Sequence, residues 1–293
     1  MTAIRSEDFK VLQPIKLSNV ATTFKTQLNK DELEERLTAI SKKIAKIQDK
    51  MYAQGKYGVL ICLQGMDTSG KDSLIREVFK EFNVRGIIVH SFKQPTDLER
   101  KHDYLWRHSL ALPERGKFAV FNRTHYENVL VTKVHPEYVL SENLPDINSV
   151  SDINASFWEN RYEQIRNFEK HLVQNGTIVL KFFLHLSKEE QRHRLLRRLE
   201  EEKHNWKFSP GDLEEREHWN DYQQCYEEAI NRTSAEQTPW FVVPADDKKL
   251  ARVIFAEILL AELQQYKDID EPELDEEIKS HLAQYKKALS EEA

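Results

Sequence analysis

Apolar residues along this chain follow two different spacings. From Asp31 to Gln54 they recur at steps of three and four residues, which predicts an amphipathic helix ended by Gly55. Short continuous apolar runs predict buried strands at residues 57–64, 86–91, 117–122, 177–186 and 240–243. Helical patterns occupy residues 71–82, 98–112, 126–134, 154–175, 188–203, 212–233 and 248–266. Apolar strands alternating with amphipathic helices indicate an α/β fold, with a parallel sheet covered on both faces.

The two ends of the chain lie outside this alternation. Residues 1–27 show no clear period and are expected to form an irregular arm. Residues 268–293 carry nine Asp or Glu against three Lys, and an acidic helical tail is expected there. Neither an internal repeat nor a low-complexity linker divides the rest, so one α/β domain is predicted over residues 28–267.

Composition narrows the classes of ligand and location. The 293 residues carry a formal charge of −6, so the protein has no global attraction for a polyanion and would need a local basic groove to bind one. No apolar stretch approaches the roughly 20 residues that span a bilayer. The first residues lack the apolar core of a signal peptide, and a cytoplasmic protein without membrane contact is expected. Cys62 lies in an apolar run and is predicted to be a buried thiol.

The clearest motif is the run Gly65-Met66-Asp67-Thr68-Ser69-Gly70-Lys71, which joins a predicted strand to a predicted helix. Two glycines separated by four residues, the second followed by Lys, give the spacing of a phosphate-binding P-loop. The glycines let backbone N–H groups point at phosphate oxygens, while the helix N-terminus and Lys71 add positive charge. An ordinary strand-to-helix turn would not need the Lys. We therefore predict a P-loop phosphotransferase.

This motif departs from the usual pattern at one position. Asp72 stands where Ser or Thr normally ligates Mg²⁺, and Ser73 follows it. Both are counted with the loop as phosphate-site residues, and Asp72 also suits the helix N-terminus. Asp67 is the obvious carboxylate for a metal, because beside phosphates it would be repelled unless a cation lay between. The alternatives for Asp67 are orienting the acceptor or capping the loop's own amides.

A second group of polar residues follows the strand at 117–122. Asn122 occupies the place of a Walker B carboxylate and could still offer an oxygen to a metal, while Arg123 could clamp a transferred phosphoryl group. Glu127 is the nearest acid able to replace the missing charge, although a surface helix residue is an equal alternative. Lys93 follows another strand to the same rim. Arg107 could contact phosphate or form a surface salt bridge.

A basic helix and a loop follow the fourth strand. Arg194 and Arg198 lie four residues apart on one helix face and could bind successive phosphates, although the neighbouring glutamates could simply pair with them. The following loop, residues 205–211, contains aromatic residues and Lys207, which suits a lid over a phosphoryl-transfer site. A lid is therefore predicted at about residues 188–216. Nucleic acid is not expected, because the net charge and the lack of binding motifs argue against it.

Several of these runs resemble the second family of polyphosphate kinases, which are polyphosphate:nucleotide phosphotransferases related to thymidylate kinase. The resemblance covers about residues 15–260. It is carried by residues 64–72, Leu105-Trp106-Arg107, residues 121–127, Glu190-Gln191, Arg194, Arg198, residues 205–210, Pro239-Trp240 and Pro244-Ala245-Asp246. The run Trp206-Lys207-Phe208-Ser209-Pro210 is specific to that family.

The resemblance implies a three-layer α/β/α P-loop kinase fold with a helical lid, and inorganic polyphosphate as donor. It implies Mg²⁺, or Mn²⁺ in its place, and a homo-oligomer, either a dimer or a tetramer. It assigns phosphate cradling to the loop and Lys71, and metal binding to Asp67. Phosphate contacts fall to Arg123, Arg194, Arg198 and Lys207. Many members carry Asp at the position of Asn122 and Asn at that of Glu127, which leaves the metal ligands open.

The resulting hypothesis is in-line transfer from polyphosphate to AMP or ADP, giving ADP or ATP, with GMP and GDP as further candidate acceptors. The chain also resembles the subgroup that accepts both mono- and diphosphates. Two alternatives remain at this point. One is an ATP-dependent nucleotide kinase of the thymidylate kinase type, which donor choice would distinguish. The other is a non-catalytic P-loop protein that binds nucleotide or polyphosphate without turnover.

Overall fold

The computed structural model describes residues 4–292, so Met1 to Ala3 of the predicted arm and Ala293 of the predicted tail lie outside it. A six-stranded sheet forms the centre, in the order β1-β6-β5-β2-β4-β3. The five strands from β6 to β3 are parallel, and β1 pairs with β6 in the antiparallel direction. The strands are β1 (Lys10–Val11), β2 (Gly58–Gly65), β3 (Ile87–Ser91), β4 (Phe118–Asn122), β5 (Thr177–His185) and β6 (Trp240–Pro244).

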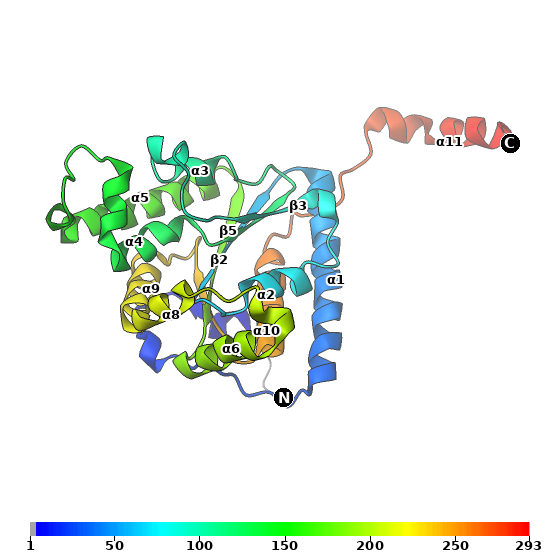
Figure 1. Ribbon diagram of the computed structural model, residues 1–293. Coiled ribbons are helices and arrows are strands. Elements are labelled where there is room, and N and C mark those ends of the chain that lie inside the picture. Colours follow the sequence, from blue (N-terminus) through cyan, green and yellow to red (C-terminus); the bar gives the residue numbers. More distant parts are fainter. Residues whose placement is uncertain (1–3, 293) are drawn as a thin grey trace.

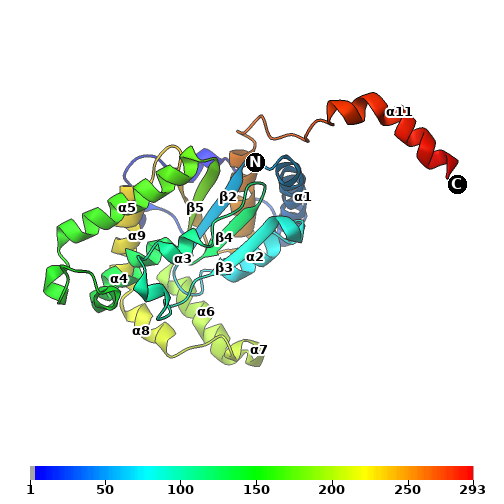
Figure 2. The ribbon, with the colours of Figure 1, turned by 90° about the horizontal axis from the view of Figure 1, so that it is seen from above.

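Helices cover both faces of this sheet, which gives the predicted three layers (Figures 1 and 2). One layer contains α1 (Lys30–Gln54), α2 (Lys71–Val78) and α10 (Lys248–Leu263), and the other contains α3 (Trp106–Ser109), α4 (Val131–Val134), α5 (Ala155–Gln174) and α9 (Trp219–Thr233). Three further helices lie at one edge: α6 (Lys188–Glu200), α7 (Glu202–Asn205) and α8 (Gly211–Glu217). The predicted α/β fold is confirmed.

Burial explains why the strands are continuously apolar. All eight residues of β2 and all five of β4 are buried, because helices pack on both sides of them. α1 begins with a capping box between Asn29 and Glu32 and ends at Gly55, whose φ of 63° favours glycine. Cys62, on β2, and Cys225, on α9, are free and buried. The predicted burial of Cys62 is confirmed.

The structure shortens or divides several predicted helices. Residues 126–134 form a 3₁₀ turn at His125–Asn128 and the four residues of α4, and the helix predicted at 188–203 is divided at Glu201 between α6 and α7. Residues 98–112 form only a 3₁₀ turn at Glu99–Lys101 and the four residues of α3. The Asp103 side chain accepts a hydrogen bond from the Leu105 N–H, and Leu98 and Leu110 are exposed, so no buried face extends along this segment. The helix predicted at 212–233 is divided at His218, because α9 buries one face against the core whereas α8 buries none.

The chain ends also differ from a simple arm and tail. The arm supplies the edge strand β1, and the backbone N–H of Val242 donates to the Phe9 carbonyl. After α10 the chain runs away from the body into α11 (Glu276–Glu291), which has no buried residue and projects outward (Figure 1). Within the described residues, every helix is too short or too polar to cross a bilayer.

Candidate active site

The P-loop links the carboxyl end of β2, a strand in the middle of the sheet, to the start of α2. Gly65 has a φ of 155° and Gly70 a φ of 107°, which favour glycine. A Cβ atom at Gly65 would lie 2.8 Å from Ser69 Oγ and 3.0 Å from the Leu184 carbonyl oxygen, so no side chain fits there. Thr68 also has a positive φ of 64°, a strained conformation for a β-branched residue. The loop is therefore held in an unusual shape.

Polar atoms without partners face into this loop. Thr68 Oγ1 and Ser69 Oγ are buried and form no hydrogen bond within the described residues. Lys71 Nζ donates to the carbonyl oxygens of Gly65 and Met66. Burial, together with the nearby charge of Arg123, lowers the pKa of Lys71 to about 8, against the attraction of Asp67 and Glu127. An anion in the loop would stabilise the charged form of Lys71.

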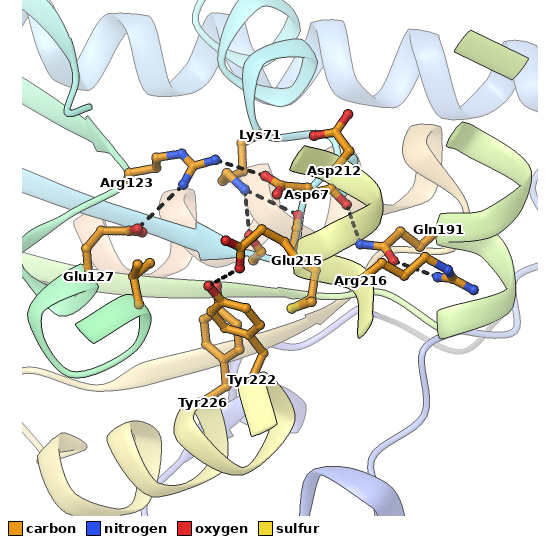
Figure 3. A pocket seen from close by; sticks show the side chains of 13 residues that line it. Asp67, Lys71, Arg123, Glu127, Gln191, Asp212, Glu215, Arg216, Tyr222 and Tyr226 are labelled. Carbon is orange, nitrogen blue, oxygen red and sulfur yellow. Dashed lines mark hydrogen bonds and ion pairs between the residues drawn. The ribbon is translucent and has the colours of Figure 1, made fainter. Parts of the chain in front are cut away.

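Arg123 lies between two carboxylates (Figure 3). Its Nη2 donates to Asp67 Oδ1 at 2.9 Å, and its Nη1 lies 3.5 Å from Glu127 Oε2. The attraction of Glu127 raises the pKa of Arg123, burial opposes this, and Asp67 adds to it. Arg123 has a φ of 61°, again a left-handed backbone in a non-glycine residue. The turn after β4 thus aims Arg123 and Glu127 at the P-loop carboxylate.

Asn122, the last residue of β4, faces the first turn of α2. Its Nδ2 donates to Asp72 Oδ1 at 2.6 Å and to Ser91 Oγ at 3.4 Å. Its Oδ1 is buried and accepts no hydrogen bond within residues 4–292. Asn122 therefore holds Asp72 with its amide and keeps a free acceptor oxygen.

Two cavities meet at this point. The larger, of about 340 Å³, is lined by seven Lys or Arg and only three Asp, together with Thr68, Ser69, Gly70, Ser73, Asn122 and His204. Its cationic side chains are Lys71, Arg123, Arg194, Arg197, Arg198, Lys207 and Lys248, and its acidic ones are Asp67, Asp72 and Asp212. The smaller, of about 30 Å³, also contains Glu127, Glu215, Tyr222 and Tyr226. Asp67, Lys71, Arg123 and Asp212 line both.

The helices α6 to α8 close the larger cavity from one side. Arg198 Nη1 donates to Asp212 Oδ2 at 2.8 Å and to the Lys207 carbonyl at 3.1 Å, so it joins α6 to the loop before α8. The Lys207 ammonium lies 5.0 Å from the centre of the Trp206 ring, and Trp206 is 78% exposed. Burial lowers the pKa of Lys248 to about 8, helped by Arg194 and Arg197. These cations crowd together without enough acids to neutralise them.

Comparison with known proteins shows to which family this chain belongs. The family model Polyphosphate kinase 2 (PPK2) matches residues 27–271. The chain belongs to the polyphosphate kinase 2 family. It is 43% identical over 261 residues to an ADP-polyphosphate phosphotransferase of Rhodopseudomonas palustris, covering 89% of each chain. It is 43% identical over 230 residues to an AMP/ADP-polyphosphate phosphotransferase of Meiothermus ruber, covering 78% of this chain and 80% of that one.

A solved structure supports the same placement. The crystal structure of Polyphosphate Kinase 2 from Arthrobacter aurescens superposes with a TM-score of 0.86 at 34% identity, over 98% of this chain and 96% of that one. The predicted family, the P-loop kinase fold and the assignment as a phosphotransferase are thereby confirmed. In this polyphosphate kinase 2 family member, the role of each site residue is inferred from the geometry of the site.

That geometry separates the predicted site residues into two groups. Most of the predicted residues line at least one of the two cavities: Gly65 to Ser73, Asn122, Arg123, Glu127, Arg198 and Lys207. Lys93 and Arg107 line neither. Arg107 lies 3.4 Å from Glu99, donates to the Lys93 carbonyl at 2.9 Å and stacks over Phe92. Their predicted phosphate contact is therefore not supported, because the local turn pairs Arg107 with its own segment.

Arg194 lines the larger cavity but differs from the prediction. It is 6% exposed, and its Nε donates to Glu190. Its Nη1 and Nη2 donate to four backbone carbonyls. All five donors of its guanidinium are thus used within the protein. A phosphate could bind Arg194 only by displacing one of these acceptors.

Sequence reasoning gave no site role to several cavity residues, although Gln191 was among the residues that carry the family resemblance. Gln191, Asp212, Glu215, Arg216, Tyr222 and Tyr226 line the smaller cavity, and Arg197, His204 and Lys248 line the larger. Most come from the lid helices or α9, far from the P-loop in sequence. Tyr222 donates to Glu215 Oε2 at 2.6 Å, which joins α8 to α9. For the residues of α9, the available signal was the four-residue spacing of Tyr222 and Tyr226 on one helix face.

Proposed function

We propose that this chain transfers the terminal phosphoryl group of inorganic polyphosphate to AMP and ADP, and that GMP and GDP are candidate acceptors. The two relatives that are 43% identical support this proposal, since their names give ADP, or AMP and ADP, with polyphosphate. One observation carries it further. A strongly cationic cavity meets the P-loop at Asp67, Lys71 and Arg123, so a chain of phosphates could lie in that cavity with its end at these residues.

The charges suit phosphoryl transfer rather than covalent chemistry. Lys71 and Arg123 would neutralise the equatorial oxygens of the transferred group, and Arg198 and Lys207 would hold the rest of the donor. Because Arg123 is paired with Asp67 and Glu127, it is held beside the P-loop before substrate arrives. The acceptor would approach from the side of Glu127. In this conformation the smaller cavity, at about 30 Å³, is too small for a nucleotide, so acceptor binding requires the lid to open.

We propose Mg²⁺ as cofactor, with Mn²⁺ able to replace it. No cluster of three or more His, Cys, Asp or Glu suited to a metal occurs within residues 4–292. Mg²⁺ in kinases is commonly held by one or two carboxylates together with substrate phosphates, and Asp67 with the free Asn122 Oδ1 fits that requirement. Glu127 would add a second carboxylate if Arg123 turned toward phosphate. The ion would neutralise charge on the phosphates.

The test is product analysis with purified protein and polyphosphate. AMP, ADP, GMP and GDP are each supplied with Mg²⁺ and no nucleoside triphosphate, and the nucleotides are separated by chromatography. We expect ADP from AMP and ATP from ADP. Triphosphate formation only when another triphosphate is added would instead favour the ATP-dependent nucleotide kinase. Polyphosphate binding without any turnover would favour the non-catalytic alternative.

A homo-oligomer and a cytoplasmic location also remain proposals. Four apolar residues of α11 recur at steps of four, three and four positions, and each is at least 37% exposed. They are Ile278, Leu282, Tyr285 and Leu289. Such an apolar seam on an isolated helix is typical of pairing between helices. Light scattering would measure the mass in solution, and a mass of 34.6 kDa, that of one chain, would exclude the oligomer.

A further inference from the structure

Three successive carbonyl groups of the P-loop are held by the first helix of the lid. Gln191 Nε2 donates to the Asp67 carbonyl at 3.1 Å. Arg194 Nη1 donates to the carbonyls of Thr68 and Ser69 at 2.9 and 3.0 Å. Gln191 and Arg194 lie three residues apart on α6, so they share one face of that helix. The whole apex of the loop is therefore attached to α6.

These two side chains are also held from behind. Arg194 Nη2 donates to the carbonyls of Ala245 and Asp246, at 2.7 and 2.9 Å, in the segment between β6 and α10. Gln191 Oε1 accepts from Arg216 Nη1 of α8 at 2.6 Å. Gln191 and Arg194 are 1% and 6% exposed. Since both are buried and satisfied, they keep one orientation.

The direction of these carbonyls sets the direction of the amides. In a trans peptide the N–H points opposite to the preceding C=O. When the Asp67 and Ser69 carbonyls turn toward α6, the N–H groups of Thr68 and Gly70 turn away from it. Neither N–H donates to a protein acceptor within residues 4–292, whereas the Ser69 N–H donates to the Met66 carbonyl. The same bonds support Thr68 in its positive-φ conformation.

We infer that Gln191 and Arg194 are positioning residues, which hold the P-loop carbonyls outward so that the Thr68 and Gly70 amides face the phosphoryl group. This inference rests on the proposed function. It gives Arg194 a role different from a phosphate contact. It also divides the lid: the start of α6 is a fixed base attached to the loop, and only the part beyond Leu195 is free to open.

The first test compares variants by charge and by shape. Arg194→Lys keeps the positive charge but cannot reach five acceptors, and Arg194→Met removes both. A displacement of the reacting groups by about 1 Å can cost about 100-fold, so we expect kcat to fall about 100-fold in both variants. We expect the KM for polyphosphate to change less than about threefold. Arg192→Met is the matched control, because within the described part of the chain exposed Arg192 pairs only with its helix neighbours Glu189 and His193.

A direct contact between Arg194 and phosphate would give different results in the same variants. A direct phosphate contact would make Arg194→Lys nearly as active as the parent. It would also reduce the slope of log binding constant against log salt for polyphosphate by about 0.7 in Arg194→Met. Either outcome would overturn the positioning role. Gln191→Leu covers the case in which Arg194→Met does not fold, since it removes only the bonds to the Asp67 carbonyl and Arg216.

The second measurement does not depend on turnover. Hydrogen exchange of the peptide covering residues 66–73 follows the Ser69 amide, which is bonded within the loop. We expect at least tenfold faster exchange in Gln191→Leu and Arg194→Lys than in Arg192→Met. Unchanged exchange would refute the inference even if activity fell. If the parent protein transfers no phosphoryl group from polyphosphate, the proposed function fails, while the exchange result still decides the positioning role.

Discussion

A buried ion pair beneath the active site gives the sharpest prediction about stability. Lys181 of β5 and Glu169 of α5 are each fully buried, and Lys181 Nζ lies 2.6 Å from Glu169 Oε2. Lys181 also donates to the Tyr126 hydroxyl at 3.1 Å and to the Thr233 carbonyl at 2.8 Å. Tyr126 in turn donates to Glu169 at 2.7 Å. This network fixes the turn after β4, which carries Glu127 next to Tyr126.

Lys181→Met should destabilise the protein strongly. Methionine fills similar volume, so the main cost is the buried Glu169 carboxylate left without its counter-charge, which is typically about 3–5 kcal/mol. Changing both residues, as Lys181→Met with Glu169→Gln, removes both charges. We expect the double variant to recover at least half of that loss, because no uncompensated charge remains in the core.

The assay is urea unfolding of Lys181→Met, Glu169→Gln and the double variant, monitored by tryptophan fluorescence and by circular dichroism. Coincident curves from the two probes would support two-state analysis. A loss below about 1 kcal/mol in Lys181→Met would refute the reasoning, because it would place the pair in the range of exposed salt bridges. A double variant less stable than both single ones would show that the network stabilises through its hydrogen bonds rather than through charge compensation.

Three further predictions concern the site and pH. Asp67→Asn should lower kcat at least about 100-fold. The free energy of unfolding should change by less than about 1 kcal/mol, because Asp67 and Arg123 form a partly exposed ion pair. Near-normal activity would exclude Asp67 as a metal ligand. Lys207→Met should raise the KM for polyphosphate and lower the salt slope by about 0.7, and an unchanged slope would place Lys207 away from the donor. Burial lowers the pKa of His108 well below its ordinary value, so protonation favours the unfolded chain and stability is lost as pH falls below that value. Urea unfolding at pH 7.5 and 5.5 should show about 1.4 kcal/mol of this loss, and His108→Phe should remove it.

Local patterns were enough to predict the P-loop and the parallel strands. The loop is contiguous, and its spacing between a strand and a helix already implies where its amides lie. Asn122 and Arg123 could be placed at the same edge because parallel strands bring their carboxyl ends together. Glu127 followed from its distance along one short turn. In each case the relevant contact is set by the chain within a few residues, or by the direction of the strands.

The remaining features depend on contacts between distant segments. The pairing of β1 with β6 joins residues about 230 positions apart, and two residues with no period give no signal of it. Arg194 could equally face solvent, phosphate or backbone, because the helix period fixes which residues share its face but not what that face meets. Lys93 was placed at the rim because it follows a strand, whereas for Arg107 a phosphate contact and a salt bridge were both left open. The pairing of Arg107 with Glu99 then turned its side chain into the local segment.

Because both native cysteines are buried, a cysteine introduced into the lid could be labelled selectively. Burial raises the pKa of Cys62 well above its ordinary value and that of Cys225 to about 11, so at neutral pH neither offers a thiolate to a reagent. A single new thiol on the exposed start of α7, as in Glu202→Cys, would therefore be alkylated alone. A fluorophore attached there would report each opening and closing of the outer lid, with every native residue except Glu202 retained.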